Sequence, residues 1–318
     1  MAKKHSPDPL LHKIRLAAID EDHAVDFLEE RRWGEEALGA SCPRCESNRV
    51  YQMRDRSGAR NKDYRWRCRA CVKMFTVRTG TIFEETRLPL RVWCHALWRA
   101  NSSKKGVSAL QISRECEISY KSALFLMHRI RHIMGVENEP TDKLGGIVEA
   151  DETYVGGKPR VSKQRSGFSG RGTKKTPVFG AVERGGKVRL QTIKNATGKT
   201  LGESLGTHVD KTSALFTDSF PAYIKPARSY AIHQSVNHSR GEYVRGIVHT
   251  NTIESVFALV KRSIYGTFHS VSKKHLHRYL NEFVFRYNLR AVSDADRTSV
   301  AIDAVVGRRL RYKEVLGG

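Results

Sequence analysis

The sequence has no long apolar run, few acids relative to bases, and few cysteines. No stretch approaches the about 18 consecutive apolar residues of a membrane-spanning helix, and residues 1–5 lack the hydrophobic core of a signal peptide. We therefore expect a cytoplasmic protein that does not contact membranes. In that reducing compartment, six cysteines favour metal binding over disulfide formation.

A large excess of basic residues is the first indication of function. The 318 residues include 56 Lys and Arg against 33 Asp and Glu, a formal net charge of +23. Residues 41–80 alone hold 11 basic and 3 acidic residues, which gives a net charge of +8. Clustered positive charge predicts an anionic partner, most often nucleic acid, whereas a basic surface that serves solubility alone is the simpler alternative.

Four cysteines form two Cys-x-x-Cys pairs within residues 41–80. The pairs are separated by 22 residues (46 to 67) and consist of Cys42, Cys45, Cys68 and Cys71. Two such pairs can hold one tetrahedral Zn²⁺ through four thiolates, which predicts a zinc ribbon. Because four thiolates leave no ligand position for water, we interpret the metal as structural; a redox dithiol is the alternative.

Two helical segments flank this ribbon in the sequence. Residues 1–40 predict an N-terminal helical segment, and residues 81–143 predict three helices, the second and third capped by Ser108 and Ser119. A link of about three residues between the last two helices is typical of a helix-turn-helix, although an ordinary three-helix packing unit is the alternative. Candidate DNA contacts in the ribbon and the third helix are Arg65, Arg67, Tyr120, Lys121 and Arg129.

The largest region, residues 144–290, predicts an α/β (α+β) domain with a mixed sheet flanked by helices. One strand contains Asp151, and a later strand ends at Asp218. A long basic loop is expected between Gly156 and Pro177, and a basic tail at 291–318. A helix then carries Glu254 at the edge of an apolar stripe formed by Ile253, Phe257, Val260 and Ile264, with Lys261 two turns further on.

Three acids of this domain are candidate ligands of hard cations. Asp218 and Glu254 are separated by 35 residues (219 to 253), and together with Asp151 they could converge on two Mg²⁺ (or Mn²⁺) ions. Such a site performs in-line displacement at phosphorus, which agrees with the charge of the chain. Taken singly, Asp218 could be a turn former and Glu254 a surface acid, and Glu149 and Glu152 compete with Asp151.

At these residues the chain resembles the zinc-ribbon DDE transposases of bacterial insertion sequences, the ISXO-type group. The resemblance covers nearly the full length and is carried by residues 27–34, 42–45, 78–83, 151–158, 217–218, 249–254, 271–283 and 286–290. It implies an RNase H-like catalytic core, with Asp151, Asp218 and Glu254 as the catalytic triad. Asn251 is then a supporting ligand or DNA contact. Because some members of the group have Asn at the third position, Asn251 is the alternative to Glu254 as the third ligand.

The resemblance further implies strand cleavage at the element ends, followed by transfer of the released 3′-OH to target DNA. Lys261 would contact phosphate, and Tyr154 or His249 could line the site. Double-stranded DNA, as terminal inverted repeats and target, would be the partner of a nucleoid-associated homodimer or higher multimer. A nuclease that only cuts, and a DNA-binding regulator with an inactive core, are the alternatives.

Overall fold

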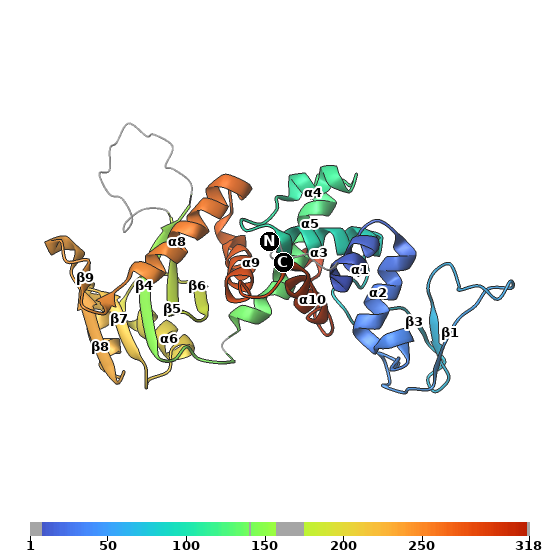
Figure 1. The fold of residues 1–318 in the computed structure, drawn as a ribbon, viewed down its shortest axis with the longest axis horizontal. Coiled ribbons are helices and arrows are strands. Elements are labelled where there is room, and N and C mark those ends of the chain that lie inside the picture. The colour runs from blue at the N-terminus through green and yellow to red at the C-terminus, as the bar shows by residue number, and fades with distance from the viewer. Residues whose placement is uncertain (1–7, 140, 157–174, 317–318) are drawn as a thin grey trace, which may run out of the picture. The chain divides into compact units, whose positions relative to one another are not determined.

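The computed structural model describes residues 8–139, 141–156 and 175–316 (Figure 1). The chain divides into two compact units. Unit 1 comprises residues 1–133 together with 292–318, and unit 2 comprises residues 134–291. Among the described residues, no helix is long and apolar enough to cross a membrane.

Unit 1 begins with two helices, as expected for residues 1–40. Helix α1 (Pro9–Ala17) and helix α2 (Glu21–Trp33) start where the carboxylates of Asp8 and Asp20 accept hydrogen bonds from backbone amides. Helix α2 ends at Gly34, whose φ of 84° favours glycine.

The ribbon forms a small antiparallel sheet of β1 (Val50–Gln52), β2 (Trp66–Cys68) and β3 (Met74–Phe75). The alternating segments 50–53 and 64–67 of the sequence predict β1 and β2, whereas no such pattern predicts β3. Trp66 of β2 packs against Trp33 and Phe75, and its indole Nε1 donates to the Glu29 carboxylate at 2.8 Å. The ribbon therefore shares an aromatic core with helix α2.

The three helices predicted between residues 81 and 143 are present. They are α3 (Leu90–Ser102), α4 (Ala109–Glu115) and α5 (Tyr120–Ile133). Ser108 Oγ accepts from Gln111 N at 3.1 Å and Ser119 Oγ accepts from Ser122 N at 3.1 Å, so both predicted caps are confirmed.

The segment expected as a basic tail instead forms helices α10 (Asp294–Asp303) and α11 (Tyr312–Leu316), and α10 packs on α3 in unit 1. Ser293 caps α10, and Ala301 and Ile302 are buried. Arg297 also donates to the carbonyl oxygen of Asn101 at 2.8 Å. Because residues 291–318 are rich in basic side chains, the short amphipathic helix α10 was not predicted from the sequence.

Unit 2 contains a mixed five-stranded sheet in the order β6-β5-β4-β7-β8, which confirms the α/β class with an RNase H-like core. Strand β4 pairs antiparallel with β5 and parallel with β7, and β7 pairs parallel with β8. The strands are β4 (Ile147–Val155), β5 (Thr176–Glu183), β6 (Val188–Thr192), β7 (Ala214–Asp218) and β8 (Ile232–Val236). The predicted basic loop falls largely on residues 157–174, outside the described residues.

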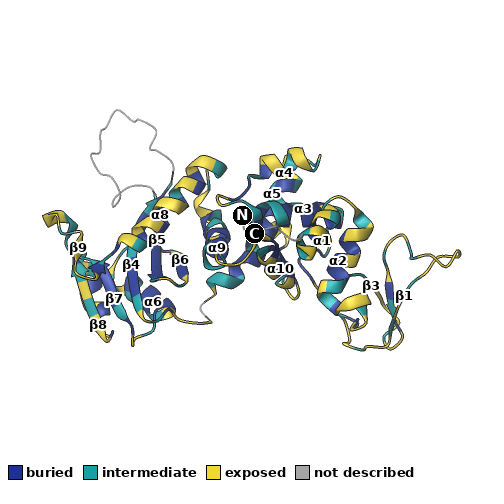
Figure 2. Ribbon diagram, in the orientation of Figure 1, coloured by how far each residue is buried: buried dark blue, intermediate teal, exposed yellow. Residues whose placement is uncertain are grey.

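Helices cover both faces of this sheet (Figures 1 and 2). Helix α6 (Gly198–His208) and the short α7 (Ile224–Ala227) pack on one face, where Val148, Ala150 and Phe179 are buried. Helices α8 (Asn251–Ser263) and α9 (Leu276–Asn288) pack on the other face against Val155, Val178 and Val182. A two-stranded sheet of β9 (Val244–Arg245) and β10 (Val248–His249) precedes α8.

Residues 134–139, which fall at the end of the helical region predicted over 81–143, belong to unit 2. They form a 3₁₀ segment (Met134–Asn138) that packs on α9 and β6. The Asn138 amide group donates to the carbonyl oxygen of Leu190 at 2.8 Å. The compact unit around the sheet therefore includes this segment, which precedes the predicted start of the core domain at residue 144.

Candidate metal centre and active site

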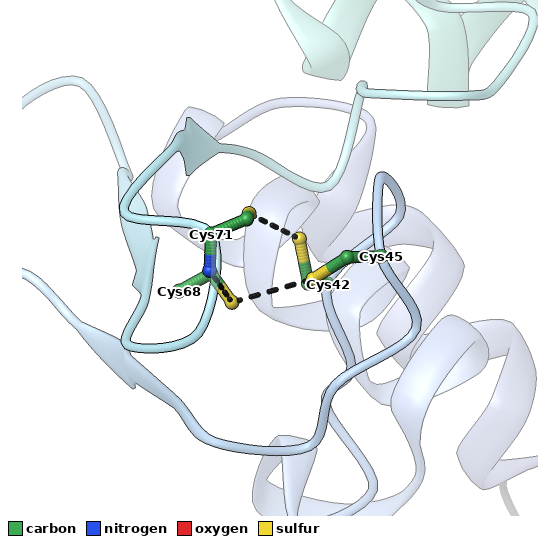
Figure 3. Close-up of side chains that lie close together, drawn as sticks. All are labelled: Cys42, Cys45, Cys68 and Cys71. Carbon is green, nitrogen blue, oxygen red and sulfur yellow. Dashed lines mark hydrogen bonds between the residues drawn. The ribbon is translucent and has the colours of Figure 1, made fainter.

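The four ribbon cysteines converge on one point (Figure 3). The Sγ atoms of Cys42 and Cys71 are 3.7 Å apart, as are those of Cys45 and Cys68, and all four lie within 4.8 Å of one another. These separations are too long for disulfides. They match the about 3.8 Å edge of a tetrahedron with Zn–S bonds of about 2.3 Å. The cluster therefore fits a structural Zn²⁺.

Of the predicted DNA contacts in the ribbon, Arg65 is exposed and pairs with Asp63 at 3.0 Å, while Arg67 is half-buried. Trp66, the residue between them, is buried. In the third helix, Tyr120 is 53% exposed, and Lys121 Nζ lies 5.2 Å from the ring centroid of Tyr312.

Arg129 differs from the expectation that it faces DNA. It is only 4% exposed, packs over the rings of Trp93 and Phe125, and donates to the carbonyl oxygen of Glu84 at 2.8 Å. Burial, with the nearby charge of Arg309, lowers the pKa of Arg129 to about 10. Its guanidinium therefore stabilises unit 1 from inside rather than presenting charge to a partner.

Asp151 and Asp218 occupy equivalent positions on neighbouring parallel strands. The β4–β7 ladder ends at the pair Ala150 and Thr217, and the two aspartates are the next residues of each strand. Residues in register on adjacent strands point to the same face and are about 5 Å apart. The first two candidate acids are thus brought side by side where the two strands stop pairing.

The apolar stripe predicted for α8 holds that helix on the same face. Ile253, Phe257, Val260 and Ile264 are each no more than 5% exposed. On the neighbouring strand β5, the residue that pairs with Asp151 is Gly180. A Cβ atom at Gly180 would lie 2.7 Å from Phe257 Cε1 and 2.9 Å from Ile253 Cδ1, so α8 packs directly on the backbone there. The absence of a side chain at Gly180 permits this close approach.

Glu254, in the first turn of α8, acts electrostatically on Asp151. The pKa of Asp151 is raised well above its ordinary value, chiefly by burial and then by the charges of Asp218, Glu152 and Glu254. Glu254 Oε1 accepts a hydrogen bond from Thr250 Oγ1 at 2.9 Å and lies 3.7 Å from His238 Nε2. Asn251 is the exposed first residue of the helix.

The three acids form a donor set suited to hard cations. Carboxylate oxygens are the preferred ligands of Mg²⁺ and Mn²⁺, and the repulsion that raises the pKa of Asp151 is the kind that a bound cation relieves. Within the described residues, only the cysteines form a group of three or more such ligands that all lie within 4.8 Å, so the acids stand further apart than that.

The other predicted site residues differ in position. Lys261 lies on α8 about 10 Å along the axis from Glu254 and on nearly the same side. Strand alternation puts Tyr154 on the face of the sheet opposite to Asp151. Glu152 points to the same face as Tyr154, and its carboxylate accepts from Tyr223 OH at 3.1 Å. His249 Nδ1 lies 3.2 Å from Glu149 Oε1.

Sequence reasoning missed the importance of Glu149, Arg184 and His238. Glu149 was weighed only as a rival of Asp151, yet it is completely buried. Its spacing of two residues from Asp151 on a strand was the available signal, because that spacing places both side chains on one face. No comparable signal marked Arg184 or His238, which are brought to the site by a turn and a short 3₁₀ helix.

Comparison with known proteins agrees with this architecture. Residues 143–288 match the ISXO2-like transposase domain, and residues 19–74 match the transposase zinc-ribbon domain. An uncharacterised protein in transposable element ISH50 of Halobacterium salinarum is 33% identical over 283 residues, covering 84% of this chain and 91% of that protein. The chain belongs to the ISXO2-like insertion-sequence transposases, a family whose partner is DNA.

Proposed function

We propose that unit 2 catalyses divalent-metal-dependent phosphoryl transfer on DNA, cutting strands at the element ends and joining them to target DNA. The observation that carries this proposal is the in-register placement of Asp151 and Asp218 beneath α8, with the charge of Glu254 acting on Asp151. Such clustered carboxylates are costly unless a cation compensates them.

Asp151, Asp218 and Glu254 would hold two Mg²⁺ or Mn²⁺ ions. When bound, such ions activate the attacking oxygen and stabilise the leaving oxygen of an in-line displacement. Glu254 is favoured over Asn251 as third ligand because its charge acts on Asp151 and a carboxylate better neutralises two dications. Asn251, exposed one turn earlier, is suited to support that ligand or to contact DNA.

The remaining polar residues of unit 2 would bind rather than react. Lys261, about two turns beyond Glu254, is placed to contact a phosphate further along the bound strand. His249 and Tyr154 are less suited to this role, because the His249 ring faces Glu149 and Tyr154 lies on the opposite face of the sheet from Asp151.

Unit 1 would recognise the terminal inverted repeats. Its helix pair α4 and α5 presents Tyr120 and Lys121 to solvent, and the ribbon presents Arg65 and, in part, Arg67. Arginine and lysine on an exposed surface supply the salt-dependent phosphate contacts of DNA binding. Pairing of two element ends would require a homodimer or a higher multimer.

The proposal is tested with the full-length protein and a DNA fragment that carries the inverted repeats flanking its gene. Asp151→Asn, Asp218→Asn and Glu254→Gln should each abolish Mg²⁺-dependent cleavage while retaining end binding in gel-shift titrations, because the acids contact the ions and not the repeat. Asn251→Ala should retain measurable cleavage. Lys121→Ala should show the converse pattern, with weaker end binding and a smaller dependence of affinity on salt.

Normal cleavage by the Asp151→Asn or Asp218→Asn protein would refute the proposed site. Loss of cleavage in Asn251→Ala, with activity retained in Glu254→Gln, would move the third ligand to Asn251. Products that are cut but never joined to target DNA would reduce the activity to that of a nuclease.

A further inference from the structure

Glu149 is a buried carboxylate placed between the sheet and the start of α8. It lies on β4 two residues before Asp151, on the same face, and is 0% exposed. Its Oε2 accepts from the backbone amides of Thr252 at 2.8 Å and Ile253 at 3.1 Å, and its Oε1 accepts from Thr252 Oγ1 at 2.9 Å. A single side chain thus joins the strand of Asp151 to the helix of Glu254.

These contacts make Glu149 the cap of α8. The first amides of a helix have no partner within the helix and carry partial positive charge, so an anion placed there stabilises the helix and fixes its start. Thr250 and Asn251 are of residue types that commonly cap the start of a helix. Among the described residues, Thr250 holds the N-cap position without a capping side-chain bond, because its hydroxyl donates to Glu254 instead.

Arg184 and His249 surround the buried negative charge of Glu149. Arg184 Nε donates to Glu149 Oε1 at 2.6 Å, while its other nitrogens donate to the carbonyl oxygens of Ile247 at 2.7 Å and His249 at 3.1 Å. The guanidinium also lies 5.1 Å from the ring centroid of Phe216, two residues before Asp218 on β7. His249 Nδ1 completes the environment at 3.2 Å.

We propose that Glu149, held by Arg184, is a positioning residue that sets the distance between Glu254 and the two aspartates. The inference rests on the proposed function, since it matters only if Glu254 works together with Asp151 and Asp218. Glu149 is bonded two residues before Asp151 on one side and one to two residues before Glu254 on the other. A change in this short connection moves the third acid relative to the first.

The test uses Glu149→Gln in the full-length protein. The amide oxygen of glutamine can still accept from the Thr252 and Ile253 amides, but its NH₂ group cannot accept from Arg184 Nε or Thr252 Oγ1. The variant also removes the negative charge that stabilises the start of α8 and pairs with Arg184. We expect hydrogen exchange at the Thr252 and Ile253 amides to accelerate. Mn²⁺ binding, monitored by electron paramagnetic resonance, should weaken. The kcat for cleavage should fall about 10- to 100-fold with the KM for DNA unchanged.

Two further variants separate positioning from general loss of stability. Glu282→Gln removes another carboxylate that is 0% exposed and paired, with Arg286 in α9, but leaves the α8 cap intact. Its Thr252 and Ile253 amides should exchange as in the native protein, and its kcat should stay unchanged. Thr252→Val removes one donor to Glu149 without leaving a charge unpaired, so it tests the same contact if Glu149→Gln does not fold. It should shift exchange and kcat in the same direction, to a smaller extent.

Faster exchange with native Mn²⁺ affinity and native kcat would make Glu149 a structural cap only and would overturn the inference. An unchanged exchange rate would overturn it too. In both cases an inactive Asp151→Asn protein leaves the proposed function standing. If Asp151→Asn instead cleaves normally, the proposed function fails and the positioning role fails with it.

Discussion

Replacing Gly180 with alanine tests whether the close packing of α8 on the sheet controls the site. The added Cβ would lie 2.7 Å and 2.8 Å from two ring atoms of Phe257 and 2.9 Å from Ile253 Cδ1, against 3.4 Å or more in ordinary contacts. Both neighbours belong to α8, so relief requires the helix, or both side chains together, to move by about half an ångström or more.

Overpacking of this kind costs about 1–3 kcal/mol. Because a displacement of about 1 Å can cost about 100-fold in rate, we expect cleavage to fall more than stability suggests. All four tryptophans lie in unit 1, so the stability of unit 2 is measured by hydrogen exchange of α8 and β5. The measured quantities are thus the exchange free energy of unit 2 and the kcat for cleavage.

Gly206→Ala is the matched control. Gly206 lies within α6, and among the described atoms none is within 4 Å of its added Cβ. Alanine in a helix is favoured over glycine by about 0.5–1 kcal/mol, so this variant should be slightly more stable and fully active. Native stability and native cleavage in Gly180→Ala would refute the argument that the contact with Gly180 positions Glu254.

Two predictions concern zinc and pH. Metal analysis should find one Zn²⁺ per chain. The Cys42→Ser, Cys68→Ser double variant should lose the Zn²⁺ and expose Trp66 to solvent, whereas Cys94→Ala, in α3, should keep the Zn²⁺. Burial and then Arg189 lower the pKa of His208 to about 4, below its ordinary value of about 6.5, so its contribution to stability is present above pH 6.5 and is lost as pH falls towards 4. Between pH 7 and 4.5, the exchange free energy of unit 2, corrected for intrinsic exchange rates, should therefore fall by about 2 kcal/mol more in the native protein than in His208→Gln. Equal losses would contradict this reasoning.

Local patterns predicted the elements well. The caps Ser108 and Ser119 depend on a hydroxyl and an amide three residues apart, so the sequence alone carries the information. The same holds for the buried stripe of α8 and for the convergence of the cysteines, where the spacing of two short motifs restricts the geometry.

Features that depend on long-range pairing were not predictable in the same way. Asp151 and Asp218 become neighbours through a parallel ladder between strands far apart in sequence, whose register no local pattern specifies. Arg129 looked like a surface cation, but the aromatic rings that enclose it come from α3 and from its own helix. The role of Glu149 depends on amides more than 100 residues away, as the separation of 103 between it and Thr252 indicates.

The path of the chain through its two units affects how the protein is made. Unit 2 is inserted between α5 and α10, so the unit that carries the ribbon is built from segments on both sides of it. During synthesis α1, α2 and α3 leave the ribosome long before α10, which packs on all three of them. Unit 1 can therefore complete its packing only after unit 2 has been translated. A premature stop codon after α9 would leave the sheet whole while damaging the unit proposed to find the DNA ends.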